Sequence, residues 1–118
     1  MLARENRLKK NKEFNYIYKK GKTINSSNFL INYVDTYLKF AKVGFGISKK
    51  LGNSVMRSKA KRIMSEVVRL NLNKMAVKNY VIVVKPSIFN VDFFTLQTEF
   101  LSCLEKHNLL RWSYAQLL

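Results

Sequence analysis

Residues 43–62 read VGFGISKKLGNSVMRSKAKR, and this stretch decides the fold because a strand pattern becomes a helix pattern within it. Residues 43–48 alternate large apolar with small side chains, which predicts a half-buried strand with one flat face. Glycines on that face allow a close approach to the backbone, by either a ligand or a packed element. From residue 55 the period is helical, and one apolar stripe is predicted to contain Met56, Ala60, Ile63, Val67 and Leu70.

The same stretch is strongly basic. Six of the fourteen residues from 49 to 62 are Lys or Arg, and the whole chain has 22 Lys and Arg against 7 Asp and Glu, a net charge of +15. Cations this dense lie on the surface and need counter-charge. Nucleic acid is the usual source, and an anionic membrane surface is a much weaker alternative.

Composition predicts one folded RNA-binding domain over residues 1–118. Hydrophobic residues make up 47% of the chain, which is too apolar for a disordered basic tail, and one Pro and four Gly give little sign of a linker. Cys103 is the only cysteine, which excludes an internal disulfide and suits a reducing compartment. Residues 1–12 lack the apolar core of a signal peptide, so we expect a soluble, cytoplasmic protein with no membrane partner.

The remaining elements are predicted from periodicity and end signals. Residues 12–20 predict a short helix closed by Gly21, and residues 29–34 a strand. The apolar run at 80–86 predicts a central strand buried on both faces, and the pattern after Asp92 predicts a C-terminal helix with that residue as N-cap. Residues 36–41 leave room for another strand. The order indicates an α/β fold with a small mixed sheet.

Catalytic chemistry is not evident in the residues. His107 is the only histidine, the carboxylates are scattered, and no set of residues has metal-ligand spacing, so we expect no catalytic residue and no metal site. Aromatic side chains could instead stack on unpaired bases. Phe14, Tyr18, Phe29 and Tyr33 are the candidates, with core packing as the alternative for each.

Residues 43–62 resemble the hallmark of the bacterial ribonuclease P protein component, in which a VGxxxSKK strand leads into a helix of the form AVxRNRxKRxxRE. The opening RLKKNKEF (residues 7–14) and the apolar run at 80–86 also resemble that family, so the resemblance covers nearly the whole chain in order. It implies a two-layer sandwich like a domain of a small-subunit ribosomal protein. The implied order is α-β-β-β-α-β-α, with three helices, a mixed four-stranded sheet and a left-handed crossover around the basic helix.

The resemblance also implies a function. The protein would be the ribonuclease P subunit that binds the catalytic RNA and the 5′ leader of precursor tRNA. Hydrolysis and most of the Mg²⁺ would belong to the RNA, with no organic cofactor and no obligate protein partner. Contacts to the catalytic RNA would come from Lys49, Lys50, Arg57, Lys59, Lys61, Arg62 and Arg69. A cleft for the single-stranded leader would be lined by Phe14, Tyr18, Gly44, Gly46 and Ser48.

The chain departs from the family pattern at four positions. Ser58 and Lys59 replace parts of the RNR triplet, Ser65 replaces a later arginine, and Asn32 stands where the family tends to carry an aromatic residue. Two other classes of function remain open from the residues alone. A structural RNA-binding protein would not stimulate precursor processing by the catalytic RNA, and a small basic nuclease would cleave RNA without it.

Overall fold

The computed structural model describes residues 2–111. The elements follow in the order that the resemblance implies: α1 (Asn11–Lys20), β1 (Lys22–Asn25), β2 (Phe29–Val34), β3 (Lys42–Ile47), α2 (Ser54–Asn71), β4 (Asn79–Val84) and α3 (Phe93–Lys106). The strands form one mixed sheet in the spatial order β1-β2-β4-β3. β3 and β4 are parallel neighbours connected through α2, and the other two strand pairs are antiparallel. The predicted mixed four-stranded sheet is therefore confirmed.

The prediction of a strand at residues 36–41 is wrong. The additional strand is β1, a short edge strand in which only Ile24 is buried. Residues 36–41 have strand-like composition, but they form the loop between β2 and β3, and Tyr37 in this loop is fully exposed. β2 already pairs with β1 on one edge and with β4 on the other, so the loop that follows it has no free edge of β2 to join.

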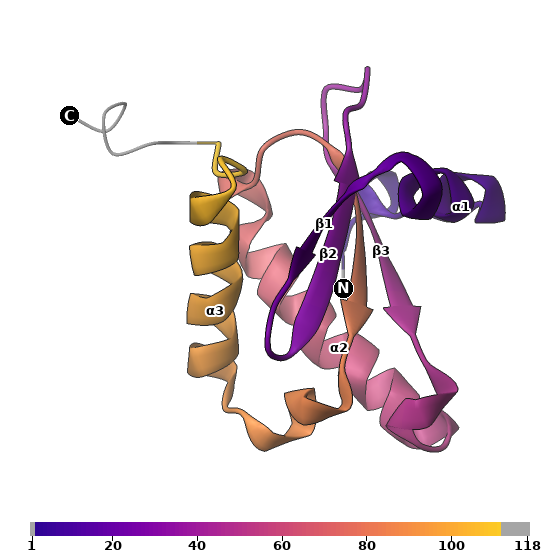
Figure 1. The fold of residues 1–118 in the computed structure, drawn as a ribbon, viewed down its shortest axis with the longest axis vertical. Helices are drawn as coiled ribbons and strands as arrows, with labels where there is room; N and C mark the ends of the chain where they lie inside the picture. The colour runs from indigo at the N-terminus through magenta and orange to yellow at the C-terminus, as the bar shows by residue number, and fades with distance from the viewer. Residues whose placement is uncertain (1, 112–118) are drawn as a thin grey trace.

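The sheet buries both of its faces, as the apolar run at 80–86 predicts. Along β4, Tyr80 and Ile82 belong to the large core beneath α2 and α3, whereas Val81 packs with Leu8 and Ile17 beneath α1. Successive side chains of a strand point to opposite faces, so α1 lies on one face and the α2–α3 layer on the other. Figure 1 shows α1 and α3 on opposite sides of the strands.

The buried face of α2 differs from the predicted stripe. Ala60 and Val67 are buried as expected, but Leu70 is 47% exposed, and Val68, which the stripe places on the polar side, is fully buried. Met64 is also fully buried. The buried face is therefore rotated by roughly 60° around the helix axis, at about 100° per residue. The rotation follows from packing, because α2 contacts both the sheet and α3.

α3 begins as predicted and is held to the sheet by polar contacts. The Asp92 carboxylate accepts a hydrogen bond from the Thr95 backbone N–H at 2.7 Å, as an N-cap does. About two turns after Asp92, Glu99 accepts hydrogen bonds from the Ser26 hydroxyl and from the backbone and side chain of Asn28, in the turn between β1 and β2. Among residues 2–111, no helix has the length and apolar character needed to cross a membrane.

Candidate nucleic-acid interface

The turn before α2 positions its first cations. The Ser48 hydroxyl oxygen accepts a hydrogen bond from the Lys50 backbone N–H at 3.1 Å, and the Asn53 side chain accepts one from the Met56 N–H at 3.0 Å. Gly52 joins these two caps with a φ of 122°, a conformation that favours glycine. The local sequence therefore begins α2 at a defined point and holds Lys49 and Lys50 directly before it.

The seven predicted RNA-contacting cations form what we call the basic α2 surface: Lys49, Lys50, Arg57, Lys59, Lys61, Arg62 and Arg69. All are exposed except Arg57, which is half-buried and whose buried Nε donor has no hydrogen-bond partner among residues 2–111. Arg69 differs from the others because it pairs with Glu66 at 2.9 Å. This pairing lowers the pKa of the Glu66 carboxyl and raises the pKa of Arg69. Arg69 therefore offers less unpaired charge than its neighbours on the helix.

The departures from the family pattern on α2 fall on different faces. Ser58 and Lys59 are exposed among the cations, so they belong to the same surface. Ser65 is 6% exposed and packs toward the interior. Its side chain therefore lies away from the basic α2 surface.

On the other face of the sheet, the predicted leader-binding residues Phe14, Tyr18, Gly44 and Gly46 come together, and Ser48 follows directly after β3. We call these five residues the α1–β3 surface. The rings of α1 lie directly over the glycines of β3. A Cβ built on Gly44 would lie 2.4 Å from Phe14 Cζ, and one built on Gly46 would lie 2.7 Å from Tyr18 Oη. The flat face of β3 is therefore occupied by α1 aromatic side chains, the packing alternative that the sequence left open.

The two aromatic residues of this surface differ in exposure. Phe14 is half-buried and packs with the small core beneath α1, so Gly44 lies buried under its ring. Tyr18 is 47% exposed, and partial desolvation raises the pKa of its hydroxyl, which stays a hydrogen-bond donor at neutral pH. Phe14 and Tyr18 therefore cover the glycines on this face of β3. Ser48 is exposed at the end of β3.

The other candidate aromatic residues serve mainly in packing. Phe29 is fully buried and meets Phe100 edge-on at a centroid distance of 6.0 Å. Tyr33 is half-buried beside Tyr80, on the face of the sheet away from Tyr18. Asn32, at the position where the family tends to be aromatic, is buried and accepts a hydrogen bond from the Thr23 hydroxyl at 2.7 Å.

The two surfaces lie on opposite faces of one sheet and meet where β3 ends and α2 begins. Sequence reasoning brought together the residues of each surface but missed two neighbours that shape them. Asn53 caps α2, a role that its position before the helix pattern could have indicated. A Cβ added to Gly46 would also lie 3.2 Å from Val83 Cγ2 on the adjacent strand β4. The two residues are far apart in the sequence, so no local pattern predicts this contact.

Several carboxylates of the described residues serve local structure. Among the described residues, no three His, Cys, Asp or Glu side chains come together as a possible metal site. Asp35 pairs with Lys78, Glu66 with Arg69, and Asp92 caps α3, so these carboxylates serve local structure.

The fold and its two surfaces define a small, basic α/β protein of the RNA-binding class. A family model described as ribonuclease P matches residues 2–108. The chain belongs to the ribonuclease P protein family, and it is thus a subunit of a tRNA-processing endoribonuclease.

Relatives in sequence and structure agree with this assignment. The ribonuclease P protein component of Alkaliphilus metalliredigens is 33% identical over 106 residues, which cover 89% of this chain and 96% of the relative. The Staphylococcus aureus RNase P protein structure aligns with a TM-score of 0.79 and 25% identity, covering 90% of this chain and 98% of that one. The RNase P protein from Thermotoga maritima shares the fold, with a TM-score of 0.77 at 24% identity, over 85% of this chain and 96% of that one.

Proposed function

We propose that this subunit contacts two RNA molecules at once, with the catalytic RNA on the basic α2 surface and the 5′ leader of precursor tRNA on the α1–β3 surface. The observation that carries the proposal is the placement of these surfaces on opposite faces of one sheet. An RNA on one face leaves the other face accessible. The connection from β3 into α2 is short, so the position of the leader is tied to the position of the catalytic RNA.

The basic α2 surface supplies affinity through phosphate neutralisation. Each phosphate contact releases condensed counterions, so binding weakens steeply with salt. Arg57 is suited to a specific contact, because its buried Nε has no partner within the described residues and a phosphate oxygen could accept from it. Ser48 and Asn53 fix the turn that presents Lys49 and Lys50 beside it.

The α1–β3 surface supplies discrimination between substrate and product. A base stacked on Tyr18 contributes on the order of 1–3 kcal/mol, and this contact exists only while the leader is attached. Precursor tRNA therefore binds more tightly than mature tRNA, and the product leaves after cleavage. Gly46 leaves room for the Tyr18 hydroxyl beside Val83.

Mg²⁺ belongs to the RNA in this proposal. The described part of the chain brings no carboxylate cluster together, so we assign no Mg²⁺ ligand to the protein. The cations of α2 act indirectly, because phosphates neutralised by Arg and Lys need fewer Mg²⁺ ions for compaction. The protein would therefore lower the Mg²⁺ concentration at which the RNA is active.

The test is cleavage of 5′-labelled precursor tRNA at low Mg²⁺ by a matched bacterial ribonuclease P RNA, with and without the protein. We expect strong stimulation by the protein and no cleavage by the protein alone. The double variant Arg57→Glu/Arg62→Glu should lose affinity for the catalytic RNA, whereas Lys106→Glu, an equal change of charge per site on α3, should not. Tyr18→Ala should weaken precursor binding, and Tyr18→Phe should preserve it.

Three results would contradict the proposal. If the protein does not stimulate cleavage of precursor tRNA by a matched RNA, only a structural RNA-binding role would remain. Cleavage by the protein alone would place catalysis in this chain. Unchanged affinity of the Arg57→Glu/Arg62→Glu variant for the catalytic RNA would remove that RNA from the basic α2 surface.

A further inference from the structure

A pocket of about 310 Å³ lies where the loop between β2 and β3 meets the C-terminal end of α2, and we call it the α2-end pocket. The loop contributes Lys39 and Phe40, α2 contributes Arg69, and the chain after α3 contributes Arg111. This volume is at the lower end of the range for small-ligand sites, so the pocket suits one nucleotide-sized group.

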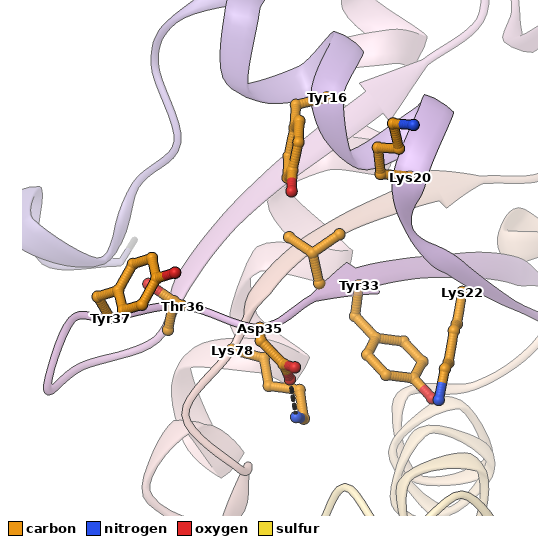
Figure 2. A pocket seen from close by; sticks show the side chains of 9 residues that line it. Tyr16, Lys20, Lys22, Tyr33, Asp35, Thr36, Tyr37 and Lys78 are labelled. Carbon is orange, nitrogen blue, oxygen red and sulfur yellow. Dashed lines mark hydrogen bonds and ion pairs between the residues drawn. The ribbon is translucent and has the colours of Figure 1, made fainter.

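A larger pocket beside α1 does not form one site of this kind. Its volume is about 470 Å³, and Figure 2 shows that Tyr16 and Lys20 reach it from α1. Tyr33, which also lines it, packs beside Tyr80 on the face of the sheet that lies away from α1. The two parts of that pocket therefore face different directions.

The apolar lining of the α2-end pocket lies on one face of the sheet. Ala41 and Met75 are buried in the large core beneath α2 and α3, and Leu72 packs against that core. Phe40 is 36% exposed, so its ring offers a surface on which an unpaired base can stack. The exposed Asn73 amide can both donate hydrogen bonds to the edge of a base and accept them from it.

Charge in the pocket favours an anion. Lys39, Arg69 and Arg111 come from three separate segments, and no Asp or Glu is among the described residues that line the pocket. Arg69 pairs with Glu66, whereas Lys39 and Arg111 form no ion pair within residues 2–111. These two cations suit a phosphate, because a guanidinium can donate two parallel hydrogen bonds to its oxygens.

Hydrogen bonds hold the walls of the pocket in place. Asn6 Nδ2 donates to the Ala41 carbonyl oxygen at 2.7 Å, which fixes the loop directly after Phe40. The backbone N–H of Arg111 donates to the Lys74 carbonyl oxygen at 2.6 Å, which fixes the chain after α3 beside the turn that follows α2. The pocket is therefore preformed, and a ligand needs to order little of the backbone around it.

We propose that the α2-end pocket binds an unpaired nucleotide of the catalytic RNA, with its base on Phe40 and its phosphate between Lys39 and Arg111. This inference rests on the proposed function, and it adds a base contact to an interface otherwise made by cations. The catalytic RNA is the favoured source of the nucleotide because Arg69 belongs both to this pocket and to the basic α2 surface. An RNA that follows α2 from Arg57 to Arg69 covers roughly 18 Å, at about 1.5 Å per residue, before it reaches the pocket.

The experiment measures the affinity of the protein for a matched catalytic RNA at several salt concentrations. Phe40→Leu should weaken binding by about tenfold, the effect of losing one stacked base, without changing the dependence on salt. Phe40→Tyr should match the wild type. Thermal melting checks that each variant is folded.

The two cations are tested in the same assay. Lys39→Ala/Arg111→Ala should make the slope of log affinity against log salt shallower by about 0.7, the value for one contacted phosphate of a single strand. Lys12→Ala/Lys106→Ala removes two exposed lysines of α1 and α3 and is the control for lost charge. This control should leave the slope unchanged.

Chemical probing of the bound RNA at saturating protein tests the base contact directly. One unpaired nucleotide should be protected in the complex with the wild type and reactive in the complex with Phe40→Leu. If no nucleotide behaves in this way, the base contact is overturned.

The outcomes separate this inference from the function on which it rests. Unchanged affinity of Phe40→Leu, or equal slope changes for the pocket and control double variants, overturns the pocket proposal. Adenosine monophosphate that binds the wild type but not Phe40→Leu, with affinity for the catalytic RNA unchanged, would also overturn it and assign the pocket to a free nucleotide. If Arg57→Glu/Arg62→Glu keeps full affinity for the catalytic RNA, the proposed function fails instead.

Discussion

Gly44 and Gly46 occupy equivalent positions on β3 but face neighbours of different rigidity. The space above Gly44 is filled by the Phe14 ring, packed in the small core beneath α1, with Leu8 Cβ 3.1 Å from the position of an added Cβ. Above Gly46 the nearest atom is the hydroxyl at the free end of the half-exposed Tyr18 side chain. The first glycine therefore serves stability, and the second serves the position of the half-exposed Tyr18 ring.

Gly44→Ala should destabilise the protein by about 1–3 kcal/mol, the usual cost of forcing an extra methyl group into a packed core. Gly46→Ala should cost less stability, because Tyr18 can move, but it should weaken precursor binding more than its stability loss explains. Urea unfolding and precursor affinity of the two variants provide the comparison. Equal stability of the two variants would show that the Phe14 ring moves away from an added methyl group as easily as Tyr18 does.

Arg57 shows how a single residue can link packing to recognition. Its half-buried position follows from the rotation of α2, which brings it to the margin of the buried face. A buried donor without a partner is unfavourable in the free protein. An RNA phosphate that accepts from Nε would relieve that penalty, so Arg57 would gain more from such a contact than a fully solvated lysine would.

At the scale of elements, α3 depends on a charged cap. The hydrogen bond from the Thr95 backbone N–H lowers the pKa of Asp92 below its ordinary value of 3.8. Because the pKa is lower in the folded state than in the unfolded chain, ionised Asp92 stabilises the fold above that ordinary value. This contribution is lost as the pH falls through the lowered pKa.

Asp92→Asn should keep the cap, because the amide oxygen can still accept the hydrogen bond, but it should remove this pH dependence. The difference in unfolding midpoint between wild type and variant should therefore shrink as the pH falls from neutral toward about 2. Asp35 and Glu66 also have lowered pKa values and add the same trend to both proteins, so only the difference reports on Asp92. A difference that stays constant with pH would contradict the assignment.

At the scale of the whole molecule, the net charge and the fold have separate consequences for RNA binding. The net charge of +15 draws the protein to any RNA, but the sheet separates a cation-rich face from a face with exposed tyrosines. Affinity from phosphates is general, whereas stacking requires unpaired bases. RNA binding at the two proposed surfaces should therefore respond differently to salt.

Binding to the catalytic RNA should weaken linearly on a logarithmic plot of affinity against salt. Arg62→Ala should make that slope shallower by about 0.7–0.9, the value for one lost phosphate contact. Arg69→Ala should change it less, because Arg69 already pairs with Glu66. Tyr18→Ala should leave it unchanged. Equal slope changes for the Arg62 and Arg69 variants would show that the ion pair with Glu66 opens on binding.

Local patterns predicted the elements but not every partner. The strands at 29–34 and 80–86, the N-cap at Asp92 and the basic helix carry strong signals of period, β-branching and capping. β1 has only one buried side chain in four, and the loop at 36–41 has a more strand-like composition. The sequence pattern therefore favours a strand at 36–41 over the strand that forms at β1. Phe14 and Tyr18 were predicted as site residues, but their contacts with the positions above Gly44 and Gly46 join α1 to β3 and have no local signature.

The sequence by itself determined that this protein is basic, that its charge is concentrated before and along one helix, and that its core comes from alternating apolar strands and helices. These properties depend on composition and on periods that repeat within a few residues. The tertiary structure decided which face of α2 is buried and which rings cover the glycines of β3. Those outcomes depend on which surfaces come into contact, because burial is a property of pairs of elements rather than of either one alone.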